Sequence, residues 1–274
     1  MRFDIAAYLA RIGLAVRPPV TLAGLRSLQA AQLGAIACEN LEPMLGATPD
    51  LSAAGIWHKL VVGGRGGSSL QLNTLLGAAL EALGFPARPV RGWSGTAPSA
   101  TRPHLAWTVR LDGRTWLVDA GLGEWGPLTP IKESEEPQAV SGTLFRVSIG
   151  ARGANTLQRQ SGTEWIDLFA YGRALKVLSA PAAGPTCPSP PAPSPAAPDL
   201  VVSLHRPSLR MSITNRVVKT EADFGTRVVE LCSGEAFART IRRTFRLNYS
   251  AEELQRLWSA MPRCPEPPAQ HAPH

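Results

Sequence analysis

The hydrophobic pattern of the chain changes abruptly at Gly84, and this change constrains the fold more than any other feature. Before it, residues 69–83 carry leucine and alanine at helical spacing, and Gly84 is a typical helix stop. After it, from about residue 85 to 180, short runs rich in β-branched and aromatic residues alternate with turn signals such as Asp112-Gly113. The pattern predicts an α+β protein in which a helical part precedes an antiparallel sheet or small barrel.

A proline-rich stretch separates this sheet from the last part of the chain. Residues 181–198 hold eight prolines and no charged residue, which excludes them from the interior of a helix or a sheet. We therefore expect a linker or loop there. The chain then divides into a helical part at 1–84, a β-barrel at 85–180, the linker at 181–198, an α/β part at 199–261 and a disordered tail at 262–274.

Individual elements can be predicted from caps and periodicity. Thr21 is a typical N-cap residue for the helix predicted after it. Ser250, with Glu253 three residues later, matches a capping box at the start of the last predicted helix. The expected elements are helices at 3–13, 21–36, 69–83 and 250–260, and strands at 104–111, 114–121, 143–149, 174–180, 208–220 and 225–232.

Composition narrows the class of protein. Hydrophobic residues make up 44% of the chain and charged residues 18%, a globular balance, and no apolar run reaches the length of a membrane helix. The net charge of +7 is spread thinly and aromatic residues are 6%, so no nucleic-acid partner is expected. The amino terminus mixes acidic and basic residues, which predicts a cytoplasmic protein. The four cysteines form no C-x-x-C pair, so we expect free thiols and no metal site.

One hairpin can be placed in register from its turn. If residues 112–113 form a two-residue type I′ turn, Leu111 pairs with Arg114. Counting back along both strands pairs Ala106 with Asp119. The register predicts that Asp119 lies at the end of a hydrophobic strand, where a buried carboxylate needs a partner.

His104 is the predicted partner of that carboxylate. It lies two residues from Ala106 and therefore on the same face of the sheet, roughly 7–8 Å from Asp119 between backbones and within side-chain reach. A carboxylate that orients an imidazole is part of a nucleophilic triad. The alternative is a buried Asp-His pair that only satisfies its own hydrogen bonds.

A glycine-rich loop supplies the third group of such a triad. Residues 63–67 are G-G-R-G-G, and Ser69 follows them at the start of the predicted helix, where the free N–H groups favour a developing anion. Ser68 and Gln71 match a capping box, so a purely structural role at the start of the helix also explains these residues. The loop lacks the Lys-Ser/Thr pair of a phosphate-binding P-loop.

Taken in this order, these residues resemble the arylamine N-acetyltransferase family, which includes amide synthases that close macrolactams. The resemblance is specific over roughly residues 36–130 and weak in the last third. Residues 65–73 match R-G-G-Y/F-C-x-E-x-N, His104 opens the matching strand, residues 36–41 resemble P-F-E-N-L, and Asp119, Gly121 and Gly123 match D-x-G-F/Y-G.

The resemblance implies a helical bundle, a β-barrel and an α/β lid, with a Cys-His-Asp triad in the cleft between bundle and barrel. It implies an enzyme that takes an acyl group from a thioester and passes it to a small amine. The co-substrate is then acyl-coenzyme A or an acyl-carrier protein, and no cofactor is tightly bound. On this basis Leu122, Gly123 and Trp125 are expected to line the acceptor pocket.

The sequence departs from the family pattern around the nucleophile. Ser69 stands at the cysteine position, Ser68 replaces the aromatic residue and Gln71 replaces the glutamate. Arg65 and Gly67 keep the motif, but Gln71 cannot balance the charge of Arg65. We therefore expect Glu39 to be the partner of Arg65.

Three functions stay open from the sequence. Ser69 can be the nucleophile of a Ser-His-Asp acyltransferase, with His104 as base and acid and Asp119 orienting it. Alternatively, His104 deprotonates the amine for direct attack on a bound thioester. The third is a binding protein that has lost its chemistry. We assign no function to the other histidines and expect His58 on the surface and His205 at the start of a strand or in a turn.

Overall fold

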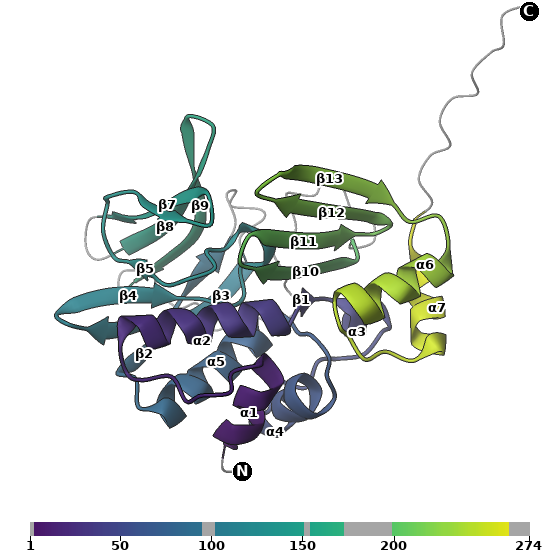
Figure 1. The fold of residues 1–274 in the computed structure, drawn as a ribbon, viewed down its shortest axis with the longest axis horizontal. Helices are drawn as coiled ribbons and strands as arrows, with labels where there is room; N and C mark the ends of the chain where they lie inside the picture. The colour runs from purple at the N-terminus through teal and green to yellow at the C-terminus, as the bar shows by residue number, and fades with distance from the viewer. Residues whose placement is uncertain (1–2, 95–101, 151–153, 173–198, 263–274) are drawn as a thin grey trace, which may run out of the picture.

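In the computed structural model, the residues described are 3–94, 102–150, 154–172 and 199–262. They form three parts: helices, a barrel-like sheet, and a second sheet with its own helices (Figure 1). This architecture confirms the predicted α+β class. The predicted strand at 174–180, the linker at 181–198 and all of the tail except Pro262 lie outside the described residues.

The amino-terminal helices are close to their predicted positions. Thr21 caps the second helix by accepting a hydrogen bond from the Gly24 N–H at 3.2 Å, and Gly84 ends the longest helix with a φ of 86°. Their leucines share one buried core with Tyr8 and Phe85. The elements are α1 Ile5–Ile12, α2 Leu22–Ala35, α3 Leu41–Met44, α4 Ala53–Trp57, the π-helix η1 His58–Val62 and α5 Ser69–Leu83.

The barrel is an antiparallel sheet of eight strands among the described residues, in the order β5-β4-β3-β2-β9-β8-β7-β6. Its interior is filled by apolar side chains that include Phe145, Leu157 and Phe169. The strands are β2 Ala87–Ser94, β3 Arg102–Leu111, β4 Arg114–Val118, β5 Ile131–Lys132, β6 Gln138–Val140, β7 Thr143–Ile149, β8 Ala154–Ser161 and β9 Glu164–Gly172. The 3-10 turn η2, Gly123–Trp125, follows β4.

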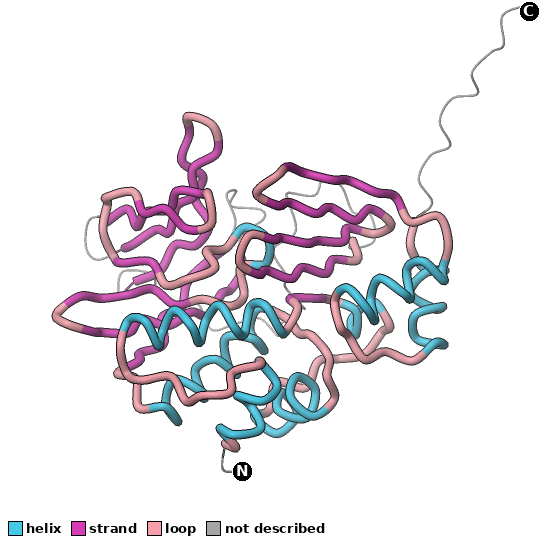
Figure 2. The backbone as a smooth tube through the Cα atoms, in the orientation of Figure 1, coloured by secondary structure: helices cyan, strands magenta, loops and turns pink. Residues whose placement is uncertain are grey.

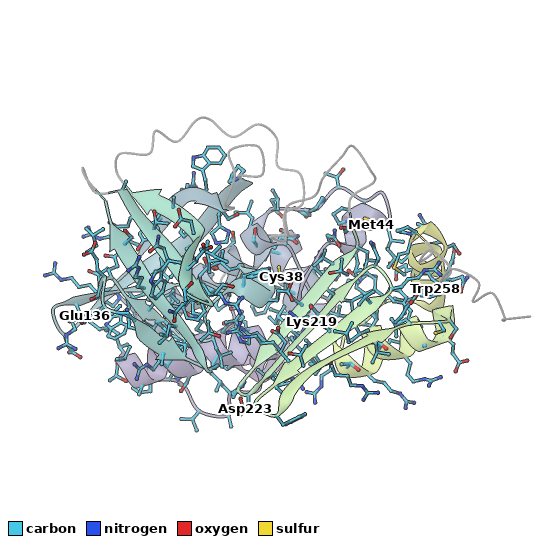
Figure 3. All side chains as sticks on the ribbon, turned by 90° about the horizontal axis from the view of Figure 1, so that it is seen from above. Cys38, Met44, Glu136, Lys219, Asp223 and Trp258 are labelled. Atoms are coloured by element: carbon cyan, nitrogen blue, oxygen red, sulfur yellow. The ribbon has the colours of Figure 1, made fainter. Side chains whose placement is uncertain are left out.

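The second sheet has the order β1-β10-β11-β12-β13, and its first strand comes from the amino-terminal part. Figure 3 shows this sheet beside the barrel, with Cys38 of β1 labelled near the middle of the molecule. The elements are β1 Cys38–Glu39, β10 Val201–Arg206, β11 Leu209–Thr214, β12 Val217–Ala222, β13 Gly225–Glu230, α6 Gly234–Arg239, the π-helix η4 Thr240–Thr244 and α7 Ala251–Ala260.

Figure 2 shows that helices lie at two edges of the molecule while strands fill its centre. The helix at the carboxyl end begins as predicted, since Ser250 and Glu253 form both hydrogen bonds of a capping box. None of the helices in the described ranges combines the length and apolarity needed to cross a membrane.

Two predictions about the second sheet and the cysteines were wrong. The run 208–220 is two strands, because Asn215 adopts a φ of 51° and turns the chain between β11 and β12. Cys38 is in a disulfide, whereas Cys232 is an exposed free thiol as expected.

Candidate active site

The start of α5 lies where the glycine-rich loop meets the core. Ser68 is the N-cap, and its hydroxyl accepts a hydrogen bond from the Gln71 N–H at 3.4 Å. The Gln71 side chain accepts in return from the Ser68 N–H at 3.1 Å, so the predicted capping box is confirmed. Ser69 is the first residue of the helix and is only 2% exposed. The structure therefore places its hydroxyl in a buried position at the positive end of the helix dipole.

The hairpin has the predicted register. Leu111 pairs with Arg114, the regular ladder continues to Val118, and both residues of the 112–113 turn have positive φ, as a type I′ turn requires. The strand β4 ends one residue before Asp119, so that its carboxylate stands at the end of the ladder.

This register brings His104 and Asp119 together. The His104 Nε2 lies 2.6 Å from the Asp119 Oδ2, and each side chain is 1% exposed. The edge of the imidazole contacts the Phe169 ring, with 4.7 Å between ring centres, and Phe169 stacks on Tyr171. Because Nε2 faces the carboxylate, Nδ1 is the ring nitrogen left to exchange a proton with a substrate or nucleophile.

Asp119 is held by residues to which the sequence alone assigned no role. Its Oδ1 accepts hydrogen bonds from the Asn73 amide at 3.0 Å and from the Gly121 N–H at 2.6 Å. The Asn73 Oδ1 also accepts from the Ala120 N–H at 2.9 Å, and the Gln29 Oε1 accepts from the Asp119 N–H at 3.3 Å. Polar side chains on the apolar face of α2 and α5 were the available sign of this network.

Asn73 and Gly121 bring the nucleophile candidate to this pair. Asn73 lies one turn after Ser69 on α5, so the helix that carries the hydroxyl also grips the Asp119 carboxylate. A Cβ at Gly121 would stand 2.8 Å from both the Cα and the Cβ of Ser69 and 2.7 Å from the Asn73 amide nitrogen. Only a residue without a side chain allows this approach.

The helix is fixed to the barrel on the same side. The Trp107 indole donates to the Asn73 carbonyl at 2.7 Å, and a Cβ at Gly77 would lie only 1.9 Å from the Trp107 ring. The two catalytic candidates of the barrel and the one of the helix therefore belong to one packed unit.

The predicted ion pair between Arg65 and Glu39 was wrong. The Arg65 guanidinium lies 2.9 Å from Glu253 on α7 and 3.5 Å from Glu42, and it stacks over the Tyr249 ring at 4.3 Å. Partial burial acts to raise the pKa of Glu253, but hydrogen bonds from Ser250 and Arg65 hold that pKa below its ordinary value. Arg65 thus ties the motif loop to the last helix.

Glu39 has other partners. Its carboxylate lies 3.3 Å from the Lys59 ammonium and accepts from the Tyr249 hydroxyl at 3.2 Å. The Lys59 ammonium also donates to the Gln71 Oε1 at 3.3 Å. Burial, with Glu39 next in effect, raises the pKa of the Tyr249 hydroxyl. Lys59, buried on η1, is therefore the charge partner of Glu39 in the place where Arg65 was expected.

The remaining predicted residues have clear places. Gly67 joins the loop to β1 by donating to the Ala37 carbonyl and accepting from the Glu39 N–H, at 3.1 and 3.0 Å. Leu122 is buried among the barrel side chains, with Trp125 packed against the same cluster. Gly123 has a φ of 59° at the start of η2. That these three residues of the loop line an acceptor pocket stays a prediction.

Two histidines outside the pair behave differently from each other. His58 is exposed, as expected. His205 is not at the start of a strand but near the end of β10, where it is 3% exposed, so that prediction was wrong. Within the described ranges, no group of three or more histidine, cysteine or acidic residues is placed to hold a metal ion.

Comparisons with known proteins show the family of the chain. A family model described as N-acetyltransferase matches residues 21–254. An arylamine N-acetyltransferase of Mycolicibacterium smegmatis is 36% identical over 181 residues, 62% of this chain and 65% of that protein. Human arylamine N-acetyltransferase 1 is 37% identical over 144 residues, 49% of this chain and 50% of that protein. These matches thus span less than two thirds of either relative's own length.

Solved structures match over a longer range. The Mycobacterium marinum arylamine N-acetyltransferase in complex with CoA has a TM-score of 0.78 and 26% identity, covering 94% of this chain and all of that one (100%). The Salmonella typhimurium arylamine N-acetyltransferase has a TM-score of 0.81 at 21% identity, covering 94% and 98% of the two chains, and it supports the fold alone.

Proposed function

Because the chain belongs to the N-acetyltransferase family, we propose that it transfers an acyl group from a thioester to a small amine through Ser69, His104 and Asp119. The observation that carries the proposal is the buried 2.6 Å contact between His104 and Asp119 beside the start of α5. The CoA complex of the Mycobacterium marinum relative supports coenzyme A as the carrier of the acyl group. An acyl-carrier protein would present the same thioester.

In the first half of the reaction, the Ser69 hydroxyl attacks the thioester carbonyl. His104 Nδ1 takes the hydroxyl proton as the new C–O bond forms, and the carbonyl π electrons move onto its oxygen. Asp119 keeps the imidazole oriented and stabilises its charge. Backbone N–H groups at the start of α5 stabilise the oxyanion. When the oxyanion collapses, the C–S bond breaks and the thiol leaves with the proton from His104.

In the second half, the amine takes the place of the hydroxyl. It attacks the acyl-serine ester, His104 accepts a proton from the amine nitrogen, and the C–O bond to Ser69 breaks. His104 returns the proton to the serine oxygen, which leaves an amide and the free enzyme. No residue undergoes a net change over the cycle.

A serine nucleophile changes the relative rates of the two halves of the reaction, acylation of the enzyme and transfer of the acyl group to the amine. A thiol near an imidazole can be ionised before attack, whereas a serine hydroxyl must lose its proton during attack. An oxygen ester is also less activated toward amines than a thioester. We therefore expect the acyl-serine to persist longer than an acyl-cysteine would, which makes it accessible to measurement.

Direct transfer without an acyl-enzyme is the second candidate. It is favoured by one observation: the changes in the R-G-G-Y/F-C-x-E-x-N motif fall at Ser68, Ser69 and Gln71, while His104 and Asp119 keep their contact. His104 then deprotonates the amine, which attacks the bound thioester itself. If neither reaction occurs, the site is that of a binding protein.

Intact-mass measurement after exposure to a panel of acyl-coenzyme A thioesters tests the proposal. We expect a single acyl adduct that is absent in Ser69→Ala and retained in Ser52→Ala, a matched control whose hydroxyl caps α4 by accepting from the Gly55 N–H at 3.0 Å. Turnover should also be lost in Ser69→Ala. If Ser69→Ala keeps turnover and His104→Ala loses it, direct transfer is the mechanism. If no variant of the chain turns over any thioester but ligands still bind, the protein is non-catalytic.

A further inference from the structure

Three basic side chains converge where the barrel meets the second sheet. His205 on β10 and Arg210 on β11 are paired residues of neighbouring strands. Arg159 comes from the barrel strand β8, and its guanidinium lies over the Trp125 ring at 4.9 Å. The turn η2, which carries Trp125, contacts both β10 and β11. We call the group of Arg159, His205 and Arg210 the junction cluster.

The junction cluster contains polar atoms that the protein does not satisfy. Among the residues that the structure describes, the Arg159 Nε, the Arg210 Nη2 and both ring nitrogens of His205 are buried without a hydrogen-bond partner. His205 is 3% exposed and Arg210 8% exposed, so bulk water does not replace the missing partners. Buried donors in folded proteins are rarely left in this state, and such groups indicate a missing ligand or ordered water.

The acidic residues nearby, Glu124 and Glu221, act on the junction cluster through their charge but give no hydrogen bond to its unsatisfied atoms. The Arg210 Nη1 donates to the main-chain carbonyl of Glu124 at 3.2 Å, while the Glu124 carboxylate accepts from the Ser212 hydroxyl at 2.8 Å. Glu221 lies 2.6 Å from the ammonium of Lys219, a residue of β12 that is labelled in Figure 3. Among the described residues, neither carboxylate forms an ion pair with Arg159 or Arg210.

The charge state of the junction cluster favours an anion over water. Burial, followed by the charges of Arg210 and Arg159, lowers the pKa of His205 to about 3, so the imidazole is neutral near pH 7. Burial, followed by Arg159, lowers the pKa of Arg210 to about 10 against the opposing charges of Glu221 and Glu124, which leaves it charged. Two guanidinium groups therefore repel each other beside a neutral imidazole, and the two carboxylates offset only part of this repulsion. A water molecule can fill hydrogen bonds but cannot reduce this repulsion, whereas an anion does both.

We propose that the junction cluster is a binding site for an oxyanion of the phosphate type, held by Arg159 and Arg210 with His205 donating through its ring N–H. The oxygens of one phosphate group can accept hydrogen bonds from several convergent donors at the same time. Because the free donor atoms are buried, binding requires a side chain to move, and Arg159 is the half-buried member of the cluster. The site does not depend on acylation of Ser69.

The position of the site gives it a link to the reacting centre. η2 begins four residues after Asp119, and Glu124 of that turn bonds to both Arg210 and Ser212 of the second sheet. An oxyanion between Arg159 and Arg210 would join the barrel to the second sheet through this turn. The phosphate can be free in solution or part of the thioester donor, and the second alternative rests on the proposed function.

Isothermal titration of the full chain with inorganic phosphate, at constant ionic strength, tests the site. We expect saturable binding that weakens about tenfold or more in Arg159→Gln and in His205→Gln. Arg88→Gln is the matched control, because Arg88 is an exposed arginine of the barrel strand β2 and should leave binding unchanged. Circular dichroism checks the folding of each variant, and the ring-proton NMR signals of His205 should shift on titration.

The two sources of phosphate are separated by adding coenzyme A and, in parallel, pantetheine, which has no phosphate. If inorganic phosphate competes with coenzyme A and Arg159→Gln weakens coenzyme A but not pantetheine, the occupant belongs to the donor. If phosphate and coenzyme A bind independently, the occupant is a free anion. Both results support the site. The proposal is overturned if the wild-type chain shows no saturable binding, or if Arg159→Gln and His205→Gln bind phosphate as tightly as the wild type. Ser69→Ala should bind phosphate normally whatever its activity, so failure of the acyl-transfer proposal is distinguishable.

Discussion

The pair of His104 and Asp119 in the candidate active site and the junction cluster are two buried polar groups that differ in how fully their hydrogen bonds are satisfied. Each oxygen of the Asp119 carboxylate has a partner, from His104, Asn73 and Gly121. In the junction cluster, four nitrogen atoms have no hydrogen-bond partner within the described part of the chain. The difference indicates that the first group is built to hold one geometry without a ligand, whereas the second becomes satisfied only when something binds.

The largest effect is expected at the satisfied pair. Asp119→Asn should lower kcat/KM for acyl transfer by about a thousandfold or more, because an amide cannot stabilise the imidazolium and favours the wrong tautomer of His104. Steady-state kinetics with an acyl-coenzyme A donor measures this, and the thermal midpoint shows whether the variant folds. A folded Asp119→Asn with normal turnover would exclude His104 and Asp119 from the chemistry.

A smaller loss should follow from crowding the contact between helix and loop. Gly121→Ala places a methyl group against Ser69 and the Asn73 amide, so we expect a loss of about 1–3 kcal/mol in the free energy of unfolding, together with reduced acylation. Urea denaturation measures the first and intact mass the second. Gly34→Ala is the control. Gly34 lies in α2, and a Cβ there would have the Arg206 side chain as its nearest neighbour, at an ordinary contact distance of 3.5 Å. Equal stability of the two variants would contradict the close approach at Gly121.

The unsatisfied cluster should reveal itself in the pH dependence of stability. The His205 pKa is lowered from 6.5 to about 3, so between these values the unfolded state binds a proton that the folded state does not. Stability from this residue is present above pH 6.5 and is lost as the pH falls toward 3, by up to about 1.4 kcal/mol per pH unit.

His205→Leu should flatten that part of the profile, measured by urea denaturation from pH 4 to 7 in a buffer without phosphate. The exposed His58 gives the comparison, since His58→Leu should leave the slope as in the wild type. Identical slopes for wild type and His205→Leu would show that folding does not lower the pKa of His205.

The smallest effect is expected at the ion pair between Arg65 and Glu253. The two side chains are 27% and 25% exposed, so solvent screening should limit their coupling in a double-mutant cycle to about 0.5–1 kcal/mol. Because the pKa of Glu253 is lowered, this contribution is present above pH 4.5 and is lost as the pH falls through the folded-state value. A double-mutant cycle between Arg65 and Glu39 should give a smaller coupling free energy than the cycle between Arg65 and Glu253. A larger coupling with Glu39 would instead support the ion pair that was predicted from the sequence.

The same contrast explains what could be predicted from the sequence. The hairpin register and both capping boxes were correct because each depends on residues close together in the chain, such as the turn at Asp112-Gly113. The contact of His104 with Asp119 followed from that register. The placement of Ser69 beside them came from the family resemblance, since no local pattern joins a helix start to a strand end.

Contacts between distant segments were missed. Glu253 lies 188 residues after Arg65, and nothing in the sequence marks it as a better partner than Glu39. The grip of Gln29 on the Asp119 N–H spans 90 residues. The burial of His205 depends on the barrel packing against the second sheet, which no periodicity of β10 encodes. Patterns of neighbouring residues thus predicted the capping boxes, the hairpin register and the contact of His104 with Asp119. The long-range contacts depend on tertiary packing, which such patterns do not show.

The two-residue strand β1 has a consequence for how the chain acquires its structure. Cys38 and Glu39 pair with Ser203 and Val202, so a piece from the beginning of the chain closes the edge of a sheet made near its end. During synthesis this strand can pair only after about 160 further residues have been added. The glycine loop that is hydrogen-bonded to β1 gains its support no earlier. The residues of β10 must therefore be synthesised before the loop that precedes Ser69 gains this support. We expect assembly of the candidate site to be a late step of folding, and we expect a variant that lacks β10 to lose support at a loop far away in the sequence.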